Sequence, residues 1–183
     1  MGTWQFDPYH TQIEFAAKHL GMMTVRGHFT DVKAGGHIDP EQPEASSVDV
    51  TVQMASIRTH NEQRDNDLRG SNILEIDKYP TMTFKSTEIK SIGEDRYELT
   101  GDLTIKGNTK PVTFTVTNLG EFNDPMMGHR IAYSGEGKIN RRDYGMTFDM
   151  MLDGRLVVSN ELKISLEGEL VEAEEEQAAT AEA

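Results

Sequence analysis

The sequence predicts an all-β protein, an eight-stranded antiparallel barrel with one short helix. Three observations support this prediction. Apolar and polar residues alternate in eight separate stretches, turn-forming residues lie between these stretches, and only one segment carries helical signals. An alternation with a period of two is typical of strands that bury one face. A chain of 183 residues also suits a single domain.

The eight predicted strands are recognised in chain order by apolar residues two positions apart. They cover residues 13–19, 25–29, 48–54, 82–84, 96–107, 112–116, 131–139 and 162–166. Turn signals separate them, such as the segment 37–43 and the segment 123–128. Eight strands with one apolar face either stack as a sandwich or close into a barrel. We expect the barrel because closure removes exposed strand edges.

One segment, residues 59–70, predicts a helix. Thr59 and Glu62 match a capping box, and Gly70 suits the residue that ends a helix. Leu68 is the sole large apolar residue in this segment. We therefore expect the helix to cover an opening or an edge of the barrel instead of filling a core.

Composition and charge exclude several classes of partner. The formal net charge is −13, and the last twelve residues hold five glutamates with no basic residue. We expect residues 1–171 to form one domain and residues 172–183 to form an acidic, disordered tail. A negative body argues against nucleic acid as a partner. No stretch approaches the ~18 apolar residues of a membrane span, so no stable membrane insertion is expected.

The sequence predicts neither cofactor chemistry nor a metal site. It has no cysteine, which excludes disulfides and thiolate ligands. His10, His19, His28 and His37 recur every nine residues, but an odd spacing alternates between the two faces of a strand, so they are not expected to converge on one ion. The start of the chain lacks the basic and apolar regions of a secretion signal, so the expected location is cytoplasmic. A chain from which a secretion signal had been removed would begin in the same way.

Four glycines stand at positions that the strand pattern places on the apolar face. They are Gly27, Gly101, Gly135 and Gly137. One interpretation is that they withdraw volume from the interior, so that the missing volume is itself a binding site. The other is that they allow bends or bulges in the sheet, where a residue without Cβ is needed. The pattern alone does not decide between the two.

Several motifs, taken together and in order, resemble a known family. They lie in residues 10–29, 101–112 and 139–146 and, most specifically, in residues 55–86. This last segment contains Ser56-Ile57, Thr59, Asn61, Arg64-Asp65, Leu68-Arg69, Tyr79-Pro80, Phe84 and Ser86. The pattern resembles the YceI-like family, lipocalin-like proteins that bind polyisoprenoid lipids, and it extends over about residues 4–170. The chain departs from the family at residues 72–74, where an aromatic-rich element is usual.

The resemblance implies an extended eight-stranded antiparallel lipocalin-like barrel around an apolar channel. It also implies non-enzymatic binding, storage or transport of an isoprenoid lipid of the polyprenyl or isoprenoid-quinone type. Such a tail gains roughly 0.8 kcal/mol per buried CH₂ group. The predicted ligand-binding residues, for which plain core packing is the alternative role, are Phe15, His19, Val25, Phe29, Val50, Val52, Met54, Phe84, Leu99, Leu103, Phe114, Val116, Ile131, Tyr133, Arg141, Leu162 and Ile164.

Two other function classes remain open at this stage. An enzyme could use the same cavity with His19, Arg141 and Asp143 as acid, anchor and orienter, although no nucleophile elbow, phosphate loop or metalloprotease motif supports it. An interaction protein with a filled barrel is the third class. His19 is expected to be buried, and the arginines Arg64 and Arg141 are expected to hold the helix and a loop in place. Methionine-rich loops are expected at the channel mouth, and they or an exposed strand edge could support a homodimer.

Overall fold

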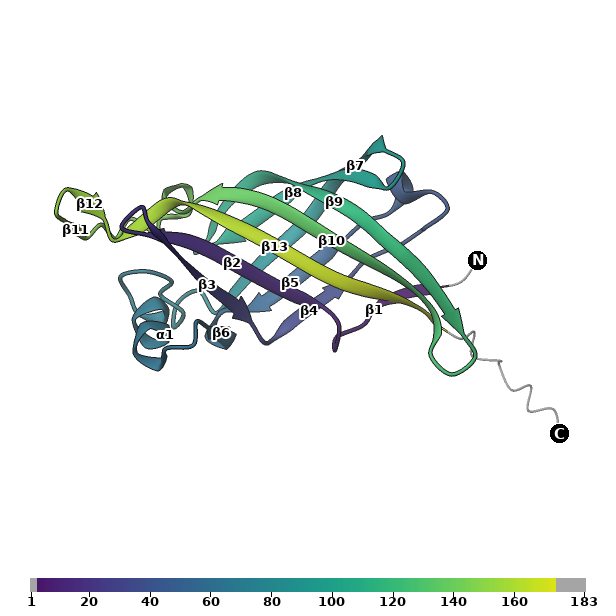
Figure 1. Cartoon of the computed structure of the whole chain (residues 1–183), viewed down its shortest axis with the longest axis horizontal. Helices are drawn as coiled ribbons and strands as arrows, with labels where there is room; N and C mark the ends of the chain where they lie inside the picture. The colour runs from purple at the N-terminus through teal and green to yellow at the C-terminus, as the bar shows by residue number, and fades with distance from the viewer. Residues whose placement is uncertain (1–2, 174–183) are drawn as a thin grey trace.

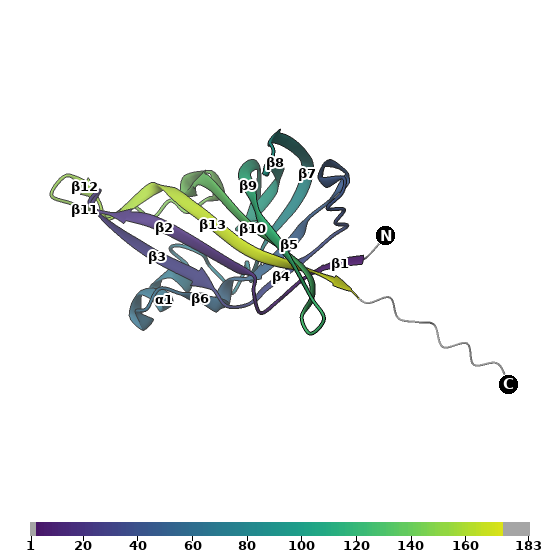
Figure 2. The same cartoon turned by 45° about the vertical axis from the view of Figure 1, so that its right-hand side comes forward.

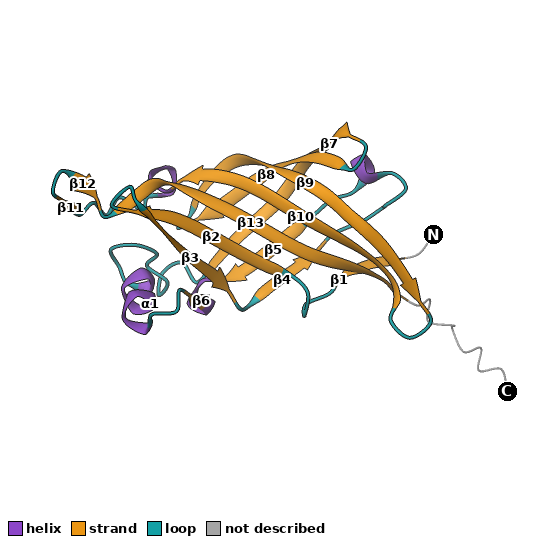
Figure 3. Ribbon diagram, in the orientation of Figure 1, coloured by secondary structure: helices purple, strands orange, loops and turns teal. Residues whose placement is uncertain are grey.

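The computed structural model describes residues 3–173, which form one curled antiparallel sheet of eleven strands with a helix outside one end (Figures 1 and 3). The sheet contains β1 (Thr3–Phe6), β2 (Gln12–His19), β3 (Met23–Phe29), β4 (Val32–Gly35), β5 (Asp49–Gln53), β6 (Ile57–Arg58), β7 (Thr81–Gly93), β8 (Arg96–Ile105), β9 (Asn108–Asp124), β10 (Gly128–Asn140) and β13 (Val158–Ala173). The remaining elements are the hairpin of β11 (Met151–Leu152) and β12 (Arg155–Leu156), the helix α1 (Glu62–Arg69), and the 3-10 turns η1 (Pro43–Ala45), η2 (Met54–Ser56) and η3 (Arg141–Tyr144).

The sheet closes on itself through two bent strands. Its order is β4-β5-β7-β8-β9-β10-β13-β2-β3-β6, and β1 pairs with the end of β13. β4 continues β3, and β6 continues β5. The pairing runs across both bends, because the Thr30 amide donates to the Ser56 carbonyl (3.3 Å) and the Gln53 amide donates to the carbonyl of Asp31 (3.0 Å). The predicted antiparallel barrel is confirmed, whereas the sheet has eleven strands instead of the predicted eight. The extra segments are these continuations and the short β1.

The interior is tightly packed at the end covered by α1. Buried side chains fill it, and Tyr144 is only 1% exposed. The principal members of this packed group are Met54, Ile57, Leu74, Ile139, Tyr144 and Met146. The helix lies outside the strands at this end, whereas β1 and the end of β13 lie at the opposite end (Figures 1 and 2). The expectation that the helix covers an end instead of filling the core is confirmed.

The helix begins differently from the prediction. Asn61, not Thr59, is the N-cap, and its side chain accepts a hydrogen bond from the Arg64 amide (2.9 Å). The amide and hydroxyl of Thr59 both donate to the buried carboxylate of Asp65. The predicted capping box is therefore wrong, because the turn at His60, with a φ of 61°, directs Thr59 to the middle of the helix. Gly70 ends the helix as predicted.

Arginines tie α1 to Thr59, which follows β6, and to the bend between β5 and β6. Arg64 donates to the hydroxyl (2.8 Å) and the carbonyl (2.6 Å) of Thr59. Arg69 donates to the carbonyl oxygens of Ala55 (3.1 Å) and Ile57 (2.9 Å). These contacts satisfy backbone groups that the bend leaves without sheet partners. The expected structural role of Arg64 is confirmed.

The inward glycines do not leave empty space. A Cβ at Gly101 or at Gly137 would lie 2.5 Å from the ring of Phe84 or of Phe114, and a Cβ at Gly135 would lie 2.7 Å from Leu166. A Cβ at Gly27 would overlap the ring of Phe15. The interpretation of the glycine positions themselves as the binding site is therefore wrong, because neighbouring side chains occupy each of them. Gly101 also lies opposite a register shift between Ser86 and Glu88, as the bulge interpretation expects.

β13 continues through Glu172 to Ala173, so the first two residues of the predicted acidic tail lie in this strand. The rest of that tail, residues 174–183, lies outside the described residues. Within residues 3–173, no helix has the length and apolar character that crossing a membrane requires.

The packing at Gly101 gives a prediction for stability. We expect Gly101→Ala to lower the free energy of unfolding by about 1–3 kcal/mol, because a Cβ would overlap both the Phe84 ring and the backbone carbonyl of Lys85. Gly93→Ala in β7 is the control, since its nearest atom would be 3.8 Å away, and its effect should be within about 0.5 kcal/mol. Urea denaturation measures both. Equal stability of the two variants would contradict this account.

Candidate functional site

The half of the barrel opposite α1 contains an apolar cavity of about 180 Å³. A single buried water needs only ~10–15 Å³, so the cavity is far larger than a packing defect. Its inner wall is made of side chains from β5, β7, β8, β9 and β13. These residues are Val50, Val52, Met82, Phe84, Leu99, Leu103, Phe114 and Ile164.

Strand direction defines an inner and an outer part of this cavity. β8 begins at the open end, with Tyr97 as its second residue, and runs toward the packed end at Ile105. β10 also begins at the open end, and Tyr133 lies in its first half. The register places Tyr97 opposite Val116 and Tyr133 opposite Gly168. Farther in, Phe84 pairs with Leu103 and Val52 pairs with Met82. The tyrosines therefore belong to the outer part and the phenylalanine and valine to the inner part.

The mouth is framed by β1, the start of β2, the end of β13 and the segment 38–46. Phe6, Ile38 and Pro40 contribute apolar surface there. Asp39 and Glu167 also border the mouth, although the side chain of Glu167 is exposed and alternates with the inward residues of β13. The Asp39 carboxylate accepts hydrogen bonds from the amides of Glu41 and Gln42, both at 3.0 Å, and so organises the turn that precedes η1.

The structure divides the predicted ligand-binding residues into two groups. Those that line the cavity are Val50, Val52, Phe84, Leu99, Leu103, Phe114, Val116, Tyr133 and Ile164. Those that do not line it are Phe15, His19, Val25, Phe29, Met54, Ile131, Arg141 and Leu162. That the first group contacts a ligand stays a prediction.

Three of the apolar residues outside the lining have clear packing roles instead. The Phe15 ring covers Gly27 and lies 5.7 Å from the ring of Phe29, measured between centroids. Met54 is 3% exposed and belongs to the packed end. These three side chains therefore pack against protein neighbours.

His19 and Arg141 also lie away from the cavity. His19 is exposed and its Nδ1 donates to the Val157 carbonyl (3.0 Å), so the expectation of a buried histidine is wrong. β2 ends at this residue, and the pairing with β13 shifts register there. The guanidinium of Arg141 is buried and donates to the carbonyls of Ser159 and Met146 and to Asp149. Its structural role, which holds the loop after η3, is confirmed.

The proposed catalytic set of His19, Arg141 and Asp143 is not gathered at the cavity. None of the three lines it, and within residues 3–173 no hydrogen bond joins one to another. The methionine-rich loops do not form the mouth either. Met146 is buried at the packed end, and the exposed methionines outside the lining are Met22, Met23, Met126, Met127, Met150 and Met151.

Sequence reasoning missed several lining residues. Ile13, Met82 and Tyr97 lie on the predicted apolar faces of their strands, so the strand phase could have identified them. Phe6 and Ile38 could not be found this way, because β1 was not predicted and Ile38 lies in a turn segment with no period.

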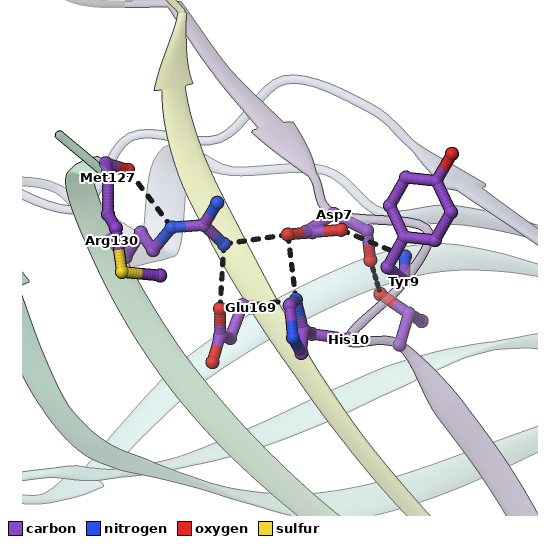
Figure 4. Close-up of polar contacts among 7 residues, drawn as sticks. Asp7, Tyr9, His10, Met127, Arg130 and Glu169 are labelled. Atoms are coloured by element: carbon purple, nitrogen blue, oxygen red, sulfur yellow. Dashed lines mark hydrogen bonds and ion pairs between the residues drawn. The ribbon is translucent and has the colours of Figure 1, made fainter.

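An ion-pair network fixes the rim of the cavity (Figure 4). Arg130 Nη1 donates to Asp7 Oδ2 (2.6 Å) and to Glu169 Oε2 (2.8 Å), and His10 Nδ1 lies 2.9 Å from Asp7 Oδ2. The Thr11 hydroxyl donates to the Asp7 carbonyl (2.7 Å). Because Asp7 and Thr11 belong to the turn between β1 and β2, the network holds that turn against β10 and β13.

Three groups of this network have a spacing that could suit a metal ion. Asp7, His10 and Glu169 each offer a ligand atom, and these atoms lie within 4.8 Å of one another. However, the guanidinium of Arg130 already bridges the two carboxylates. An ion at this position would have to displace that arginine, so we assign the network to holding the rim.

The network also changes the ionisation of Asp7. Burial by itself would raise the pKa of this carboxyl, but the hydrogen bonds from Arg130, His10 and the Tyr9 amide outweigh burial and hold the pKa well below its usual range. The ionised form is therefore the one that stabilises the fold.

Comparisons with known proteins agree with this architecture. The family model of the YceI-like domain matches residues 4–170. A UPF0312 protein of Pseudomonas paraeruginosa is 39% identical over 159 residues, which cover 87% of this chain and 81% of that protein. The crystal structure of a Campylobacter jejuni YceI protein has a TM-score of 0.75 and 31% identity, with 86% of this chain and 90% of that chain covered.

A third comparison shows the fold alone, since its sequence identity is only 14%. It is the structure of a polyisoprenoid binding domain from Saccharophagus degradans, implicated in plant cell wall breakdown. The TM-score is 0.66, and the match covers 94% of this chain and 100% of that chain.

Asp7 gives a prediction for stability and its pH dependence. Its stabilising contribution is present above its ordinary pKa of 3.8 and is lost as the pH falls below that value, because the folded-state pKa is the lower one. We expect Asp7→Asn to lower the free energy of unfolding by about 1–3 kcal/mol at neutral pH and by much less at pH values near 2. Urea denaturation across this pH range measures the difference.

The control is Asp102→Asn, which changes an exposed carboxylate on β8. Asp102→Asn should change the free energy of unfolding very little, both at neutral pH and near pH 2. A loss of stability for Asp7→Asn that does not depend on pH would count against the ionic role of the carboxylate.

Proposed function

The chain belongs to the YceI-like domain family, and we propose that it binds the tail of an isoprenoid lipid inside the barrel without chemical change. The observation that carries the proposal is the cavity, whose inner wall consists of aliphatic, methionine and phenylalanine side chains. An isoprenoid tail offers only hydrocarbon to such a wall, and each buried CH₂-sized group contributes roughly 0.8 kcal/mol.

The contrast between the two ends of the barrel supports this proposal. At the packed end, protein side chains fill the interior, whereas the open half leaves an apolar cavity unfilled. Unfilled apolar space costs stability, because the lining side chains lose packing contacts. A hydrocarbon chain restores these contacts, so its binding stabilises the folded protein.

The position of titratable groups supports binding rather than catalysis. The inner wall carries only apolar side chains. A chain in the inner cavity would therefore meet no acid or base. We propose that the ligand is a polyprenyl lipid or an isoprenoid quinone. Its storage or transport requires that the protein bury the tail reversibly and leave it unchanged. The similarity to a structure described as a polyisoprenoid binding domain also supports the proposal.

The test is to identify what the purified protein contains. We expect organic extraction followed by mass spectrometry to recover an isoprenoid from the wild-type protein. Leu103→Trp should abolish this recovery, because the indole would enter the inner cavity from β8. Val116→Trp offers a second block nearer the mouth, where the residue is only half-buried and the larger side chain is easier to accommodate.

Asp102→Trp is the matched control, because it places the same side chain on the exposed face of the same strand. It should keep the lipid, and circular dichroism should show all variants folded. If wild type contains no isoprenoid and takes up none that is added, the proposed function is wrong. If the folded Val116→Trp and Leu103→Trp variants both retain as much lipid as the wild-type protein, the lipid binds elsewhere.

A further inference from the structure

Exposed apolar side chains gather at the end of the molecule that contains the cavity mouth. The hairpin of β9 and β10 presents Leu119, Phe122, Met126 and Met127, and the turn between β1 and β2 presents Tyr9. Met126 is 94% exposed and Tyr9 is 89% exposed. We call these five residues the mouth-end patch. A group of large apolar side chains left in water marks an interaction surface.

The hairpin that carries most of this patch continues from the cavity wall. Tyr133 and Leu170 line the cavity, and β10 runs from Gly128, next to the hairpin turn, to Tyr133 and beyond. Ile131 pairs with Leu170, so β10 extends three residues, or about 10 Å, past that pair to Gly128. Figures 1 and 2 show the hairpin at the end of the molecule away from α1. A surface that met the hairpin tip would therefore lie next to the mouth.

Arg130 holds the hairpin and the Tyr9 turn in place (Figure 4). Its Nε donates to the Met127 carbonyl (3.1 Å), and its Nη1 donates to the Asp7 carboxylate (2.6 Å). The same carboxylate accepts a hydrogen bond from the Tyr9 amide (2.8 Å). Met127 and Tyr9 are thus joined by one network and lie on either side of the Arg130–Asp7 pair. Because their backbone is ordered before any partner binds, docking loses little conformational entropy.

The size of the patch suits a lipid surface and not a protein. A stable protein interface uses roughly 20–30 residues on each side. The mouth-end patch has five, and the carboxylates of Glu121 and Asp124 lie among them in the sequence. A lipid surface needs no matching shape, because single apolar side chains insert between its molecules. Tyr9 suits its boundary, since a tyrosine ring is apolar at one end and polar at the other.

The charges of the hairpin favour lipids that carry no net charge. In the segment 118–130 the basic side chains are His129 and Arg130. The ring of His129 lies 3.1 Å from the carboxylates of both Glu121 and Glu172, and Arg130 is held by two carboxylates of the rim network. Surfaces that bind anionic lipids instead present clusters of lysine and arginine.

We propose that the mouth-end patch docks the protein reversibly on a surface of zwitterionic lipid, such as phosphatidylcholine, with Phe122, Met126 and Met127 inserted at the level of the head groups. Docking brings the mouth against the lipid, so that an isoprenoid tail passes between the bilayer and the cavity with little exposure to water. The role in transfer rests on the proposed function. Docking itself is measured without any isoprenoid.

The first experiment is flotation of the full chain with phosphatidylcholine vesicles. Met126→Ser combined with Met127→Ser should weaken binding at least about tenfold, because two apolar side chains no longer leave water. The matched control is Met22→Ser combined with Met23→Ser. It makes the same change at two exposed methionines where β2 turns into β3, at the end away from the mouth, and should bind like wild type. Replacing part of the phosphatidylcholine by phosphatidylserine should weaken binding of the wild-type protein.

The second experiment measures transfer of geranylgeraniol from donor vesicles to acceptor vesicles. The Met126→Ser, Met127→Ser variant should transfer it roughly tenfold more slowly than wild type, in proportion to its weaker docking. Its affinity for geranylgeraniol in solution should be unchanged, since neither methionine lines the cavity. The Met22→Ser, Met23→Ser control should transfer at the wild-type rate.

The outcomes separate this inference from the proposed function. If wild type does not bind phosphatidylcholine vesicles, or if both double variants bind as wild type does, docking through the patch is overturned, even when isoprenoid is recovered from the protein. If wild type sediments as a dimer without vesicles and the Met126→Ser, Met127→Ser variant as a monomer, the patch joins two copies and lipid docking is again overturned. If vesicles bind through the patch but no isoprenoid is bound or transferred, docking stands and the proposed function fails.

Discussion

The architecture depends on β13, because this strand joins the two ends of the chain into one closed sheet. It pairs with β10 along one edge and with both β2 and β1 along the other. Its register brings Ile164 and Leu170 to the cavity wall. Without these pairings the N-terminal strands would separate from the C-terminal ones, and the cavity would lose a wall. The Arg130 network reinforces the closure at the rim, where β1 offers only four paired residues.

The same closed sheet is used in two ways along its length. At one end the helix α1 and the turn η3 are fastened by buried arginine and aspartate contacts, and side chains fill the interior. At the other end the interior stays apolar but unfilled. Gly101 and Gly137 leave room for the aromatic rings of Phe84 and Phe114. A hydrocarbon chain can fill this apolar interior, which is the physical reason for assigning an isoprenoid tail to the cavity.

The sequence was sufficient to predict features that depend on local patterns. The alternation of residues 96–107 predicts both the strand β8 and the inward position of Leu103, and Gly70 predicts the end of the helix. The sequence was insufficient to predict features that depend on contacts between residues far apart in the chain. The Arg130 side chain meets Asp7 across 123 positions, which no periodicity reports. Gly101 suggested a vacancy because the pattern shows which side a residue faces, but not that the ring of Phe84 covers it.

The central claim is that the open half of this barrel holds an isoprenoid tail. The most direct measurement is a crystal structure of the protein grown with geranylgeraniol. The account predicts a continuous chain between Val52, Phe84 and Phe114. A cavity filled by rearranged protein side chains, or a ligand bound only on the outer surface, would contradict it.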